Sequence, residues 1–487
     1  MKLYTYESYH RQEYTICKFY NFMSLNLTNL ESSLDEIKDE MYSLMENLFP
    51  ICRSITGNGV RQTLEILQNL IPLSQYEIPT GTKVFDWIVP KEWNINDAFI
   101  MDSSGKKVVD FKDSNLHILN YSIPQDTEIS FNELKKHLFS IPEQPDVIPY
   151  VTSYYNENWG FCLEHNRLVK MKNEMYRVVV DSKLENGFLT YGEFLIKGEF
   201  KDEILISTYV CHPSMCNDNL SGIVVATALA KYLKNFNLKY SIRFLFIPET
   251  IGAITWISQN EEKMKNIKHG LVLTCIGDRG KFVYKKTRMG NAEIDNTVIK
   301  ILKKSNADFD IVDFYPWGSD ERQFSSPAFN LPVGSLMRSV PNREITKEYH
   351  TSADNLNFMS KKSLLDSFEK YFLIIEELEK KIEEPETISN NFQKKLINDQ
   401  EDYYINTNPK CEPQLGKYQL YENFGGQYDI EKKYMKNAIF WVLNLSDGFH
   451  SLEEIAKRSN LELKLVQTAT ELLETKKLVM RKNDANM

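Results

Sequence analysis

The sequence predicts an α/β protein with a doubly wound, mainly parallel sheet, an inserted β-rich domain and a C-terminal winged-helix domain. From residue 188, buried apolar strands such as EILISTYV, YSIRFLFI and GLVLTCIG alternate with helical stretches, which is typical of a parallel sheet covered on both faces. Before them, short alternating runs separated by PTG, PKE and SSG predict an antiparallel β region. From residue 436, the order helix, turn, helix, turn, helix and short basic strand predicts a winged helix.

The helices that flank these regions have clear apolar spacing. In SLDEIKDEMYSLMENLF (33–49), apolar residues recur at helical spacing, and Ser33 and Glu36 resemble a capping box. The segment ITGNGVRQTLEILQNLI (55–71) predicts a glycine-containing turn and a second helix. A strongly helical stretch at 360–386 is followed by IEEPETISNN, which is typical of a linker.

These patterns divide the chain into five parts. We expect an N-terminal extension (1–30), an α/β domain in two pieces (31–85 and 185–386), the inserted β-rich domain (86–184), a linker (387–405) and the winged-helix domain (406–487). The extension has weak periodicity, so we expect it to be poorly ordered. Translation could start at Met1 or at Met23.

Composition limits the function classes. A chain of 487 residues is expected to form two or three domains. Its 58 basic and 67 acidic residues give a net charge of −9, which disfavours general binding to nucleic acid. The first residues contain no apolar core of a signal peptide, and no run of about 18 apolar residues could span a bilayer. Seven scattered cysteines favour reduced thiols, so we expect a cytoplasmic protein without membrane contact.

Titratable side chains follow several predicted strands and two later loops: His212, Asp218, Glu249, Asp278, Asp320, Glu321, His350 and Asp354. Because ligands of an open α/β sheet bind at the carboxyl ends of its strands, these side chains can converge in one cleft. Two histidines and an aspartate are ligands that zinc takes at a catalytic site, leaving a position for water. Glu249 would then be the general base that takes a proton from that water.

Taken singly, each residue also has a structural explanation. His212 could be a hydrogen-bonded core histidine, and His350 could be a turn residue. Asp218 could cap the helix that begins near residue 221, and Glu249 could be a favourable charge at a helix N-terminus. The acids of WGSDERQF could be solvated loop charges. Only the joint arrangement on successive strand ends favours a metal site.

A structural zinc knot is a third interpretation of the same region. Cys211, His212 and Cys216 supply three suitable ligand types. A second Cys/His pair with matching spacing is missing from the sequence, so this interpretation is disfavoured and the cysteines are expected to pack.

The chain resembles the zinc aminopeptidase superfamily, which includes bacterial leucyl aminopeptidases, carboxypeptidase G-like relatives and glutaminyl cyclases. More closely, it resembles a bacterial group of aminopeptidase-like proteins with an inserted β-rich domain and a winged-helix tail. The resemblance covers roughly residues 31–480, and the following segments carry it: CRSITGNGVRQTLEIL, TSYYNENWGFCL, STYVCHPSMCNDNLSG, FIPETIG, Ser319-Asp320 with Phe324, and Tyr349-His350-Thr351 with Asp354.

The resemblance implies a zinc-exopeptidase type of α/β domain and a role for each matching residue. His212 and His350 match the metal-binding histidines, Asp218 matches the metal-bridging aspartate, and Glu249 matches the general base. The chain departs from the superfamily at two further ligand positions. Thr250 stands where a carboxylate commonly follows the base, and Thr274-Cys275 stand where an aspartate ends the next strand. The remaining ligands suffice for one zinc ion, and two are not excluded.

Those departures also affect substrate binding. In the aminopeptidases, the missing carboxylates help to hold the free α-amino group of the substrate. We therefore expect Asp278, Asp320 or Glu321 to supply negative charge in their place. Arg338 could pair with a substrate carboxylate, although a structural ion pair explains it equally well.

The insert and the tail have less specific patterns. Aromatic residues in FDWIVPKEW and YYNENWGF suggest a packed β core, and the second segment could also wall the cleft. The winged-helix tail is nearly neutral, and its presumed recognition helix LELKLVQTATELLETKK contains no arginine. Protein contacts or a homo-oligomer are therefore expected of the tail rather than nucleic-acid binding.

The sequence thus predicts a zinc-dependent amide hydrolase of the aminopeptidase type. Its expected substrate is a small peptide-like, aminoacyl or acylamino compound. The alternative is a catalytically degenerate relative that acts as a binding or scaffold protein through its winged helix. Metal content would separate these two hypotheses.

Overall fold

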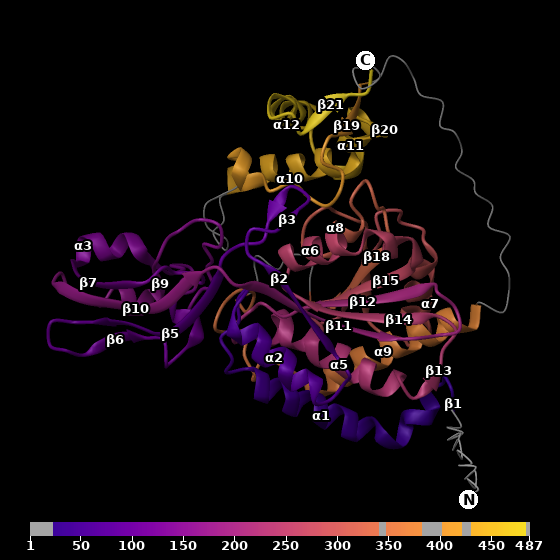
Figure 1. The fold of residues 1–487 in the computed structure, drawn as a ribbon, viewed down its shortest axis with the longest axis horizontal. Helices are drawn as coiled ribbons and strands as arrows, with labels where there is room; N and C mark the ends of the chain where they lie inside the picture. The colour runs from indigo at the N-terminus through magenta and orange to yellow at the C-terminus, as the bar shows by residue number, and fades with distance from the viewer. Residues whose placement is uncertain (1–22, 340–346, 382–401, 421–429, 484–487) are drawn as a thin grey trace, which may run out of the picture.

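The computed structural model describes residues 23–339, 347–381, 402–420 and 430–483. Three parts are visible in Figure 1: a central α/β domain, an inserted β-rich domain that extends to one side, and a C-terminal module on top. Residues 1–22 of the expected N-terminal extension and 387–401 of the expected linker lie outside the described residues. No helix in the described ranges is both long and apolar enough to cross a membrane.

The central sheet has eight strands in the order β17-β16-β18-β15-β12-β14-β11-β2. Its strands are β2 (Ser74–Pro79), β11 (Phe188–Ile196), β12 (Glu203–Tyr209), β14 (Ser241–Ile247), β15 (Ile267–Leu273), β16 (Phe282–Lys285), β17 (Phe309–Val312) and β18 (Val333–Arg338). The four central strands β18, β15, β12 and β14 are parallel. Strand β11 runs antiparallel to β14 and β2, and β16 runs antiparallel to β18 but parallel to β17. This confirms the predicted mainly parallel sheet.

Helices cover both faces of this sheet (Figure 1). They are α1 (Leu34–Leu48), α2 (Asn58–Gln68), α5 (Ser221–Leu233), α6 (Ile251–Gln259), α7 (Glu293–Lys304), α8 (Glu321–Phe324) and α9 (Lys361–Lys381). α1, α5 and α9 contact one another on one face, whereas α6 and α8 lie on the other. Strands β12, β14 and β18 are buried at every position and are mostly apolar because both faces of the sheet are covered.

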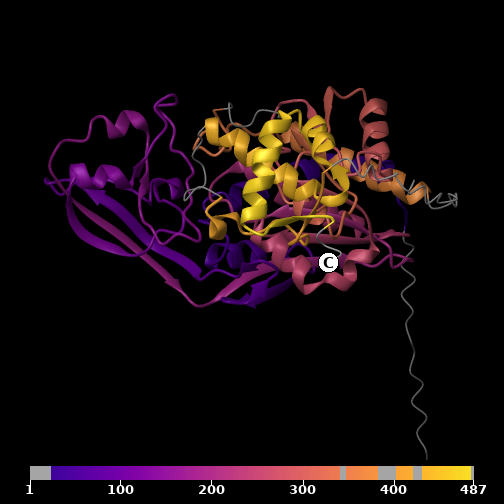
Figure 2. The same ribbon diagram turned by 90° about the horizontal axis from the view of Figure 1, so that it is seen from above.

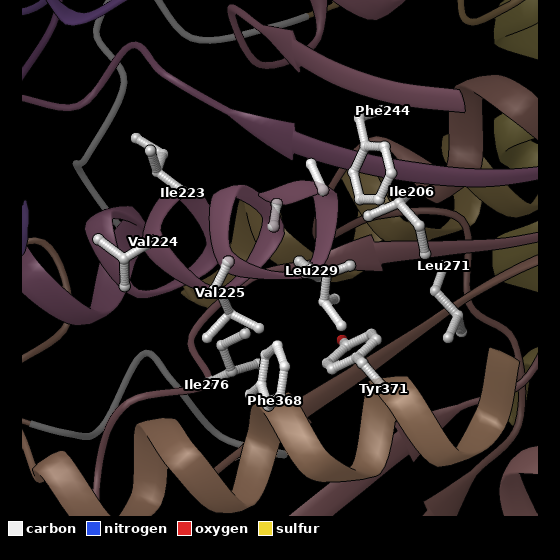
Figure 3. Close-up of a cluster of buried hydrophobic side chains, with 14 of the residues drawn as sticks. Ile206, Ile223, Val224, Val225, Leu229, Phe244, Leu271, Ile276, Phe368 and Tyr371 are labelled. Atoms are coloured by element: carbon white, nitrogen blue, oxygen red, sulfur yellow. The ribbon is translucent and has the colours of Figure 1, made fainter. Parts of the chain in front are cut away.

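The core on the α5 face consists of buried side chains from the central strands and from the helices that pack on them. Figure 3 shows Ile206 of β12 and Phe244 of β14 facing α5, with Phe368 of α9 closing the cluster. Leu205, the neighbour of Ile206, belongs to the cluster on the opposite face. This alternation follows from the two-residue period of a strand.

The inserted domain is built on a four-stranded antiparallel sheet in the order β6-β5-β10-β7. Its elements, with those leading into it, are β3 (Lys83–Val84), β4 (Trp87–Ile88), β5 (Glu92–Met101), β6 (Lys107–Asp110), β7 (Gln125–Ser130), α3 (Phe131–Leu134), β8 (Leu138–Phe139), β9 (Phe161–Cys162), α4 (His165–Leu168) and β10 (Met175–Glu185). β10 leads through a short turn into β11, so the insert is joined directly to the central sheet.

The C-terminal module is a winged helix with its own apolar core. It contains β19 (Tyr403–Asn406), α10 (Ile430–Leu445), β20 (Asp447–Ser451), α11 (Leu452–Ser459), α12 (Leu463–Thr475) and β21 (Val479–Arg481). Strand β19 lies between β20 and β21 and begins inside the stretch expected to be a linker. Figure 2 shows the module lying over the α/β domain.

Residues 23–33 form two short elements that sequence periodicity did not reveal. β1 (Met23–Ser24) pairs with β13 (Phe236–Asn237), and a 3-10 helix spans Leu27–Ser33. Leu30 is buried in the main core, which explains why this end of the expected extension is ordered. The exact domain limits remain a prediction.

Candidate metal centre

Two of the predicted ligands lie between the end of β12 and the start of α5. His212 follows the strand by three residues, and Asp218 lies in a kinked turn, Cys216–Leu220, where its own backbone is not helical and which leads into α5. A Cβ at Gly222 would come within 2.5 Å of the carbonyl oxygen of Leu273, at the end of β15. The glycine therefore lets α5 begin against the carboxyl ends of the strands, which brings Asp218 to that edge of the sheet.

The other two predicted residues come from a neighbouring strand end and a later loop. Glu249 lies between β14 and α6, and β14 is the parallel neighbour of β12. His350 lies in the loop before α9 and has a φ of 55°. Because the carboxyl ends of parallel strands share one edge, Glu249 and His212 meet there.

The structure brings all four residues together. The ligand atoms of His212, Asp218 and His350 lie within 4.8 Å of one another. His350 Nε2 is 3.0 Å from Asp218 Oδ2, and His212 Nδ1 is 3.8 Å from Asp218 Oδ1. Glu249 Oε2 is 3.8 Å from His212 Nε2. The arrangement is a His/Asp/His group with a second carboxylate beside it.

This donor set fits a zinc ion. His212 is 5% exposed, and its Nδ1 has no hydrogen-bond partner among the described residues; the same holds for His350 Nδ1. Burial lowers the pKa of His212 to about 4, an effect that the Asp218 carboxylate only partly offsets. The imidazole is therefore neutral at pH 7 and keeps a lone pair for a metal. Two imidazoles and a carboxylate are the ligand types of a catalytic zinc site.

Asp218 is itself held by groups that sequence reasoning assigned no role. The Tyr209 hydroxyl donates to Asp218 Oδ1 and lies 2.7 Å from Thr274 Oγ1. The buried Asp354 carboxylate accepts the N–H of Asn217 at 2.6 Å and the N–H of Asp218 at 2.9 Å. Tyr209 is the last residue of the buried strand β12, and its hydroxyl at a strand end was the available signal.

The histidines are fixed by two further residues outside the predicted set. The Tyr150 ring, from the insert, lies edge-on to both imidazoles, with ring centroids 5.2 Å from His212 and 5.5 Å from His350. Tyr150 N–H also donates to the His350 carbonyl oxygen at 2.8 Å. Arg53 is fully buried, and its Nε donates to the His212 carbonyl oxygen at 2.9 Å. An arginine inside the otherwise uncharged run CRSITG was the signal for its burial.

The acids predicted to bind substrate differ in their surroundings. Asp278 accepts hydrogen bonds from Asn217 Nδ2 at 2.8 Å and from Gly280 N at 2.6 Å, and Ser339 also donates to it. Asp278 thus bonds the residue before the candidate ligand Asp218, and its carboxylate already accepts three hydrogen bonds.

Asp320 and Glu321 are both fully buried. Asp320 Oδ1 accepts the N–H of Thr250 at 2.7 Å, which places it beside the residue after the base, and Oδ2 has no hydrogen-bond partner among the described residues. Burial raises the pKa of Asp320 to about 7. Glu321 instead forms a buried ion pair with Lys285.

Arg338 makes its contacts away from the metal ligands. Its guanidinium donates to the Gly280 carbonyl oxygen at 2.8 Å and to Ser367 Oγ at 3.1 Å, and it pairs with Asp366. These contacts account for it as a structural ion pair. A role of Arg338 in substrate binding stays a prediction without support from this geometry.

Comparison with known proteins identifies the family. Residues 42–381 match a family described as a domain of unknown function, DUF4910, and residues 402–481 match a winged helix-turn-helix family. The chain belongs to the DUF4910 family. A relative from Clostridium acetobutylicum, named as a candidate polysaccharide biosynthesis protein with an aminopeptidase-like domain, is 52% identical over 438 residues, which are 90% of this chain and 95% of the relative.

Solved structures place this family on the aminopeptidase fold. A crystal structure of a candidate peptidase from Clostridium acetobutylicum is similar with a TM-score of 0.71 and 49% identity, over 93% of this chain and 99% of that one. A zinc aminopeptidase from Bacillus subtilis is similar with a TM-score of 0.53 and 12% identity, over 71% and 95%. The predicted relationship to zinc aminopeptidases, with a C-terminal winged helix, is confirmed at the level of the fold.

Proposed function

We propose that the protein is a zinc-dependent amide hydrolase of the aminopeptidase type that uses one zinc ion. The observation that carries this proposal is the convergence of His212, Asp218 and His350 within 4.8 Å, with the Glu249 carboxylate beside them. A zinc ion held by these three residues would supply Lewis acidity, polarising the scissile carbonyl group and a water molecule.

Glu249 is suited to move the proton. Its side chain is 23% exposed and that of His350 is 22% exposed, whereas those of His212 and Asp218 are 4% and 2% exposed, so water and substrate reach the group from the side of Glu249 and His350. Its N–H donates to Cys211 Sγ at 3.2 Å, which fixes the start of the turn after β14. Glu249 would accept a proton from the attacking water and pass it to the leaving amine.

The contacts of Asp218 favour one metal rather than two. In a two-metal site a bridging carboxylate uses both oxygens as ligands. Here the Tyr209 hydroxyl donates to Asp218 Oδ1, and Thr274 Oγ1 lies 2.7 Å from that hydroxyl oxygen. Thr274 stands where the superfamily has a metal-binding aspartate. Oδ2 lies 3.0 Å from His350 Nε2, whereas Oδ1, which accepts the Tyr209 hydroxyl, lies 3.8 Å from His212 Nδ1. Tyr209 thus occupies the side that a second metal would need.

The insert limits the size of the substrate. The buried Tyr150 lies edge-on to both histidines, and its hydroxyl is 2.9 Å from the Tyr154 hydroxyl. We therefore propose small peptide-like, aminoacyl or acylamino substrates. The polysaccharide-biosynthesis name of the 52% identical relative adds acylated amino sugars to the compounds worth testing.

The proposal is tested by metal analysis combined with turnover. Untagged protein should contain one zinc per chain, His212→Ala should lose it, and His137→Ala, a histidine stacked on Trp159 in the insert, should keep it. Glu249→Gln should keep the zinc and lose about 10²-fold or more in kcat against a panel of aminoacyl and acylamino amides. The exposed Glu262→Gln is the matched control, with unchanged turnover.

Each other outcome contradicts a definite part of the proposal. Protein that binds no zinc under zinc-replete conditions would favour the degenerate binding or scaffold protein. Two zinc ions per chain would refute the role given to Tyr209. Full activity of Glu249→Gln would exclude Glu249 as the base.

A further inference from the structure

The residue that follows the proposed base has an unfavourable backbone conformation. Thr250 has a φ of 62°, a region that β-branched residues rarely adopt. It lies between Glu249 and the first residue of α6. A backbone conformation of this kind persists only where the surrounding contacts hold it. The position of Glu249 therefore depends on what binds Thr250.

Two side chains from the loop around α8 bind Thr250. Asp320 Oδ1 accepts its N–H at 2.7 Å, and Arg322 Nη2 donates to its Oγ1 at 3.0 Å. Arg322 also donates through Nη1 to the Ser319 carbonyl oxygen at 3.3 Å. One arginine thus connects the backbone next to the base with the loop that carries Asp320.

Arg322 is in turn oriented by a residue of the C-terminal region. Glu412 accepts Arg322 Nε at 2.7 Å through Oε2 and Arg322 Nη2 at 3.2 Å through Oε1, so the pair is bidentate. The two side chains are only 13% and 16% exposed, so solvent screens the pair weakly. Burial disfavours the charged guanidinium, but the Glu412 carboxylate outweighs this effect and raises the pKa of Arg322.

Glu412 lies on a segment that is anchored on both sides. We call residues 407–418, between β19 and α10, the connecting segment. Its backbone N–H groups at Cys411 and Glu412 donate to Ser326 Oγ and Gln323 Oε1, both at 3.0 Å. The Glu412 carbonyl oxygen accepts Trp87 Nε1 at 2.8 Å, at the entrance to the insert. The segment therefore touches the α/β domain and the insert at the same residue.

We propose that Glu412 and Arg322 are positioning residues, through which the C-terminal region holds the backbone that carries the base Glu249. This inference rests on the proposed function only in naming Glu249 as the base. It gives the winged-helix region a role inside the molecule: it completes the surroundings of the candidate active site. Any partner that displaced the connecting segment would change turnover without touching the metal ligands.

Glu412→Gln tests the inference in the full-length zinc-bound protein, because the substitution keeps the shape of the side chain and removes its charge. We expect kcat against an aminoacyl coumarin amide to fall about 10-fold, with KM within about two-fold and one zinc per chain retained. Lys410→Gln is the matched control, since Lys410 lies on the same segment in an exposed pair with Glu261, and it should leave all three quantities unchanged.

Hydrogen exchange provides a readout that does not depend on activity. Glu412→Gln should increase amide exchange in a peptide covering residues 247–258, and Lys410→Gln should not. Unchanged exchange in that peptide would overturn the inference, whatever happens in the winged helix. If the wild-type protein hydrolyses no probe, the proposed function fails, and the exchange result still decides the inference.

A double-mutant cycle separates positioning from general destabilisation. Thr250→Val removes the Oγ1 acceptor of Arg322 and keeps the β-branched shape at φ 62°. If Glu412 acts on Thr250 through Arg322, the two substitutions disturb the same contact. The kcat of the Glu412→Gln/Thr250→Val double variant should then lie within about two-fold of the kcat of the less active single variant. Fully multiplicative losses would contradict the inference.

Discussion

At the scale of single residues, the convergence of the candidate ligands could be predicted, and the groups that support them could not. His212, Asp218 and Glu249 could be predicted as site residues because they follow apolar strands, and such strands are easy to recognise in a sequence. The role of Asp354 was hidden, since it holds the N–H of Asp218 across a sequence separation of 136 residues. No local pattern reports such a contact. The structure brings the predicted residues together, and their chemical roles stay predictions.

Asp320→Asn is expected to change how stability depends on pH. Burial raises the pKa of Asp320 from 3.8 to about 7 in the folded chain. Between these values the folded protein keeps a proton that the unfolded chain has lost, so the contribution of Asp320 to the free energy of unfolding should fall as pH rises from about 4 to about 7 and level off above. The asparagine variant cannot titrate, so its Tm should fall less over this window. Calorimetry of metal-free protein at stepped pH values measures the difference.

The control for this prediction is Asp126→Asn, because the Asp126 side chain is 65% exposed. Its Tm profile should parallel that of the wild type. A profile for Asp320→Asn that also parallels the wild type would show that the buried carboxyl is already ionised in the folded protein at pH 4.

At the scale of elements, the sequence predicted whether a segment is a helix or a strand better than it predicted the residues at which the element ends. A helical stretch was predicted between the strands YSIRFLFI and GLVLTCIG, but α6 ends at Gln259 and a 3-10 helix, Glu261–Asn266, follows. Asn260 causes the break: its φ is −135°, and its Nδ2 donates to the Trp256 carbonyl oxygen at 2.7 Å. Side-chain competition of this kind interrupts a helix without interrupting the apolar pattern.

The insert contributes an element to the metal centre that strand patterns did not reveal. Its segment 148–150 runs beside the loop that carries His350. Tyr150 N–H donates to the His350 carbonyl oxygen at 2.8 Å, and Ser352 N–H donates to the Ile148 carbonyl oxygen at 2.9 Å. Ile148 N–H donates to Ser352 Oγ at 3.0 Å. The insert thus holds the backbone around the candidate ligand His350 as well as packing against the site.

Ser352→Ala should weaken zinc binding several-fold without removing a ligand. The substitution leaves the Ile148 N–H without its acceptor, which costs about 1 kcal/mol and loosens the loop around His350. Competition with a chromophoric chelator measures the zinc affinity. Ser103→Ala is the control, because Ser103 bonds Glu174 at an exposed site of the insert. An affinity equal to that of the control would show that the loop is held without this hydrogen bond.

At the scale of the whole molecule, hydrophobic periodicity predicted three parts but not how they are joined. The C-terminal module rests on the α/β domain mainly through side chains that the sequence shows only as isolated polar or aromatic residues. Trp317 of the α/β domain lies edge-on to Trp441 of α10, with ring centroids 6.2 Å apart. Arg288, which is 7% exposed, reaches from the α/β domain into the module. Their partners are more than 100 residues away, so no local signal marked them.

Arg288→Met should separate the unfolding of the C-terminal module from that of the α/β domain. Arg288 donates to Asn444 Oδ1 at 2.9 Å and pairs with Asp447 Oδ2 at 2.6 Å. Methionine keeps the packing volume but leaves the largely buried Asp447 carboxylate without this cation, at a cost of about 3 kcal/mol. Because the loss falls on the junction, we expect the wild type to unfold in one calorimetric transition and Arg288→Met to unfold in two, with the C-terminal module melting first.

The exposed pair of Arg177 with Asp126, in the insert, provides the matched control for the junction. Arg177→Met should cost at most about 1 kcal/mol and keep a single transition, because solvent screens an exposed ion pair. A single transition for Arg288→Met, merely shifted to lower temperature, would mean that the aromatic contacts around Trp317 suffice to couple the parts. In that case Trp317→Ala would be the substitution that separates them, since it removes the apolar side of the junction and leaves the core of the winged helix in place.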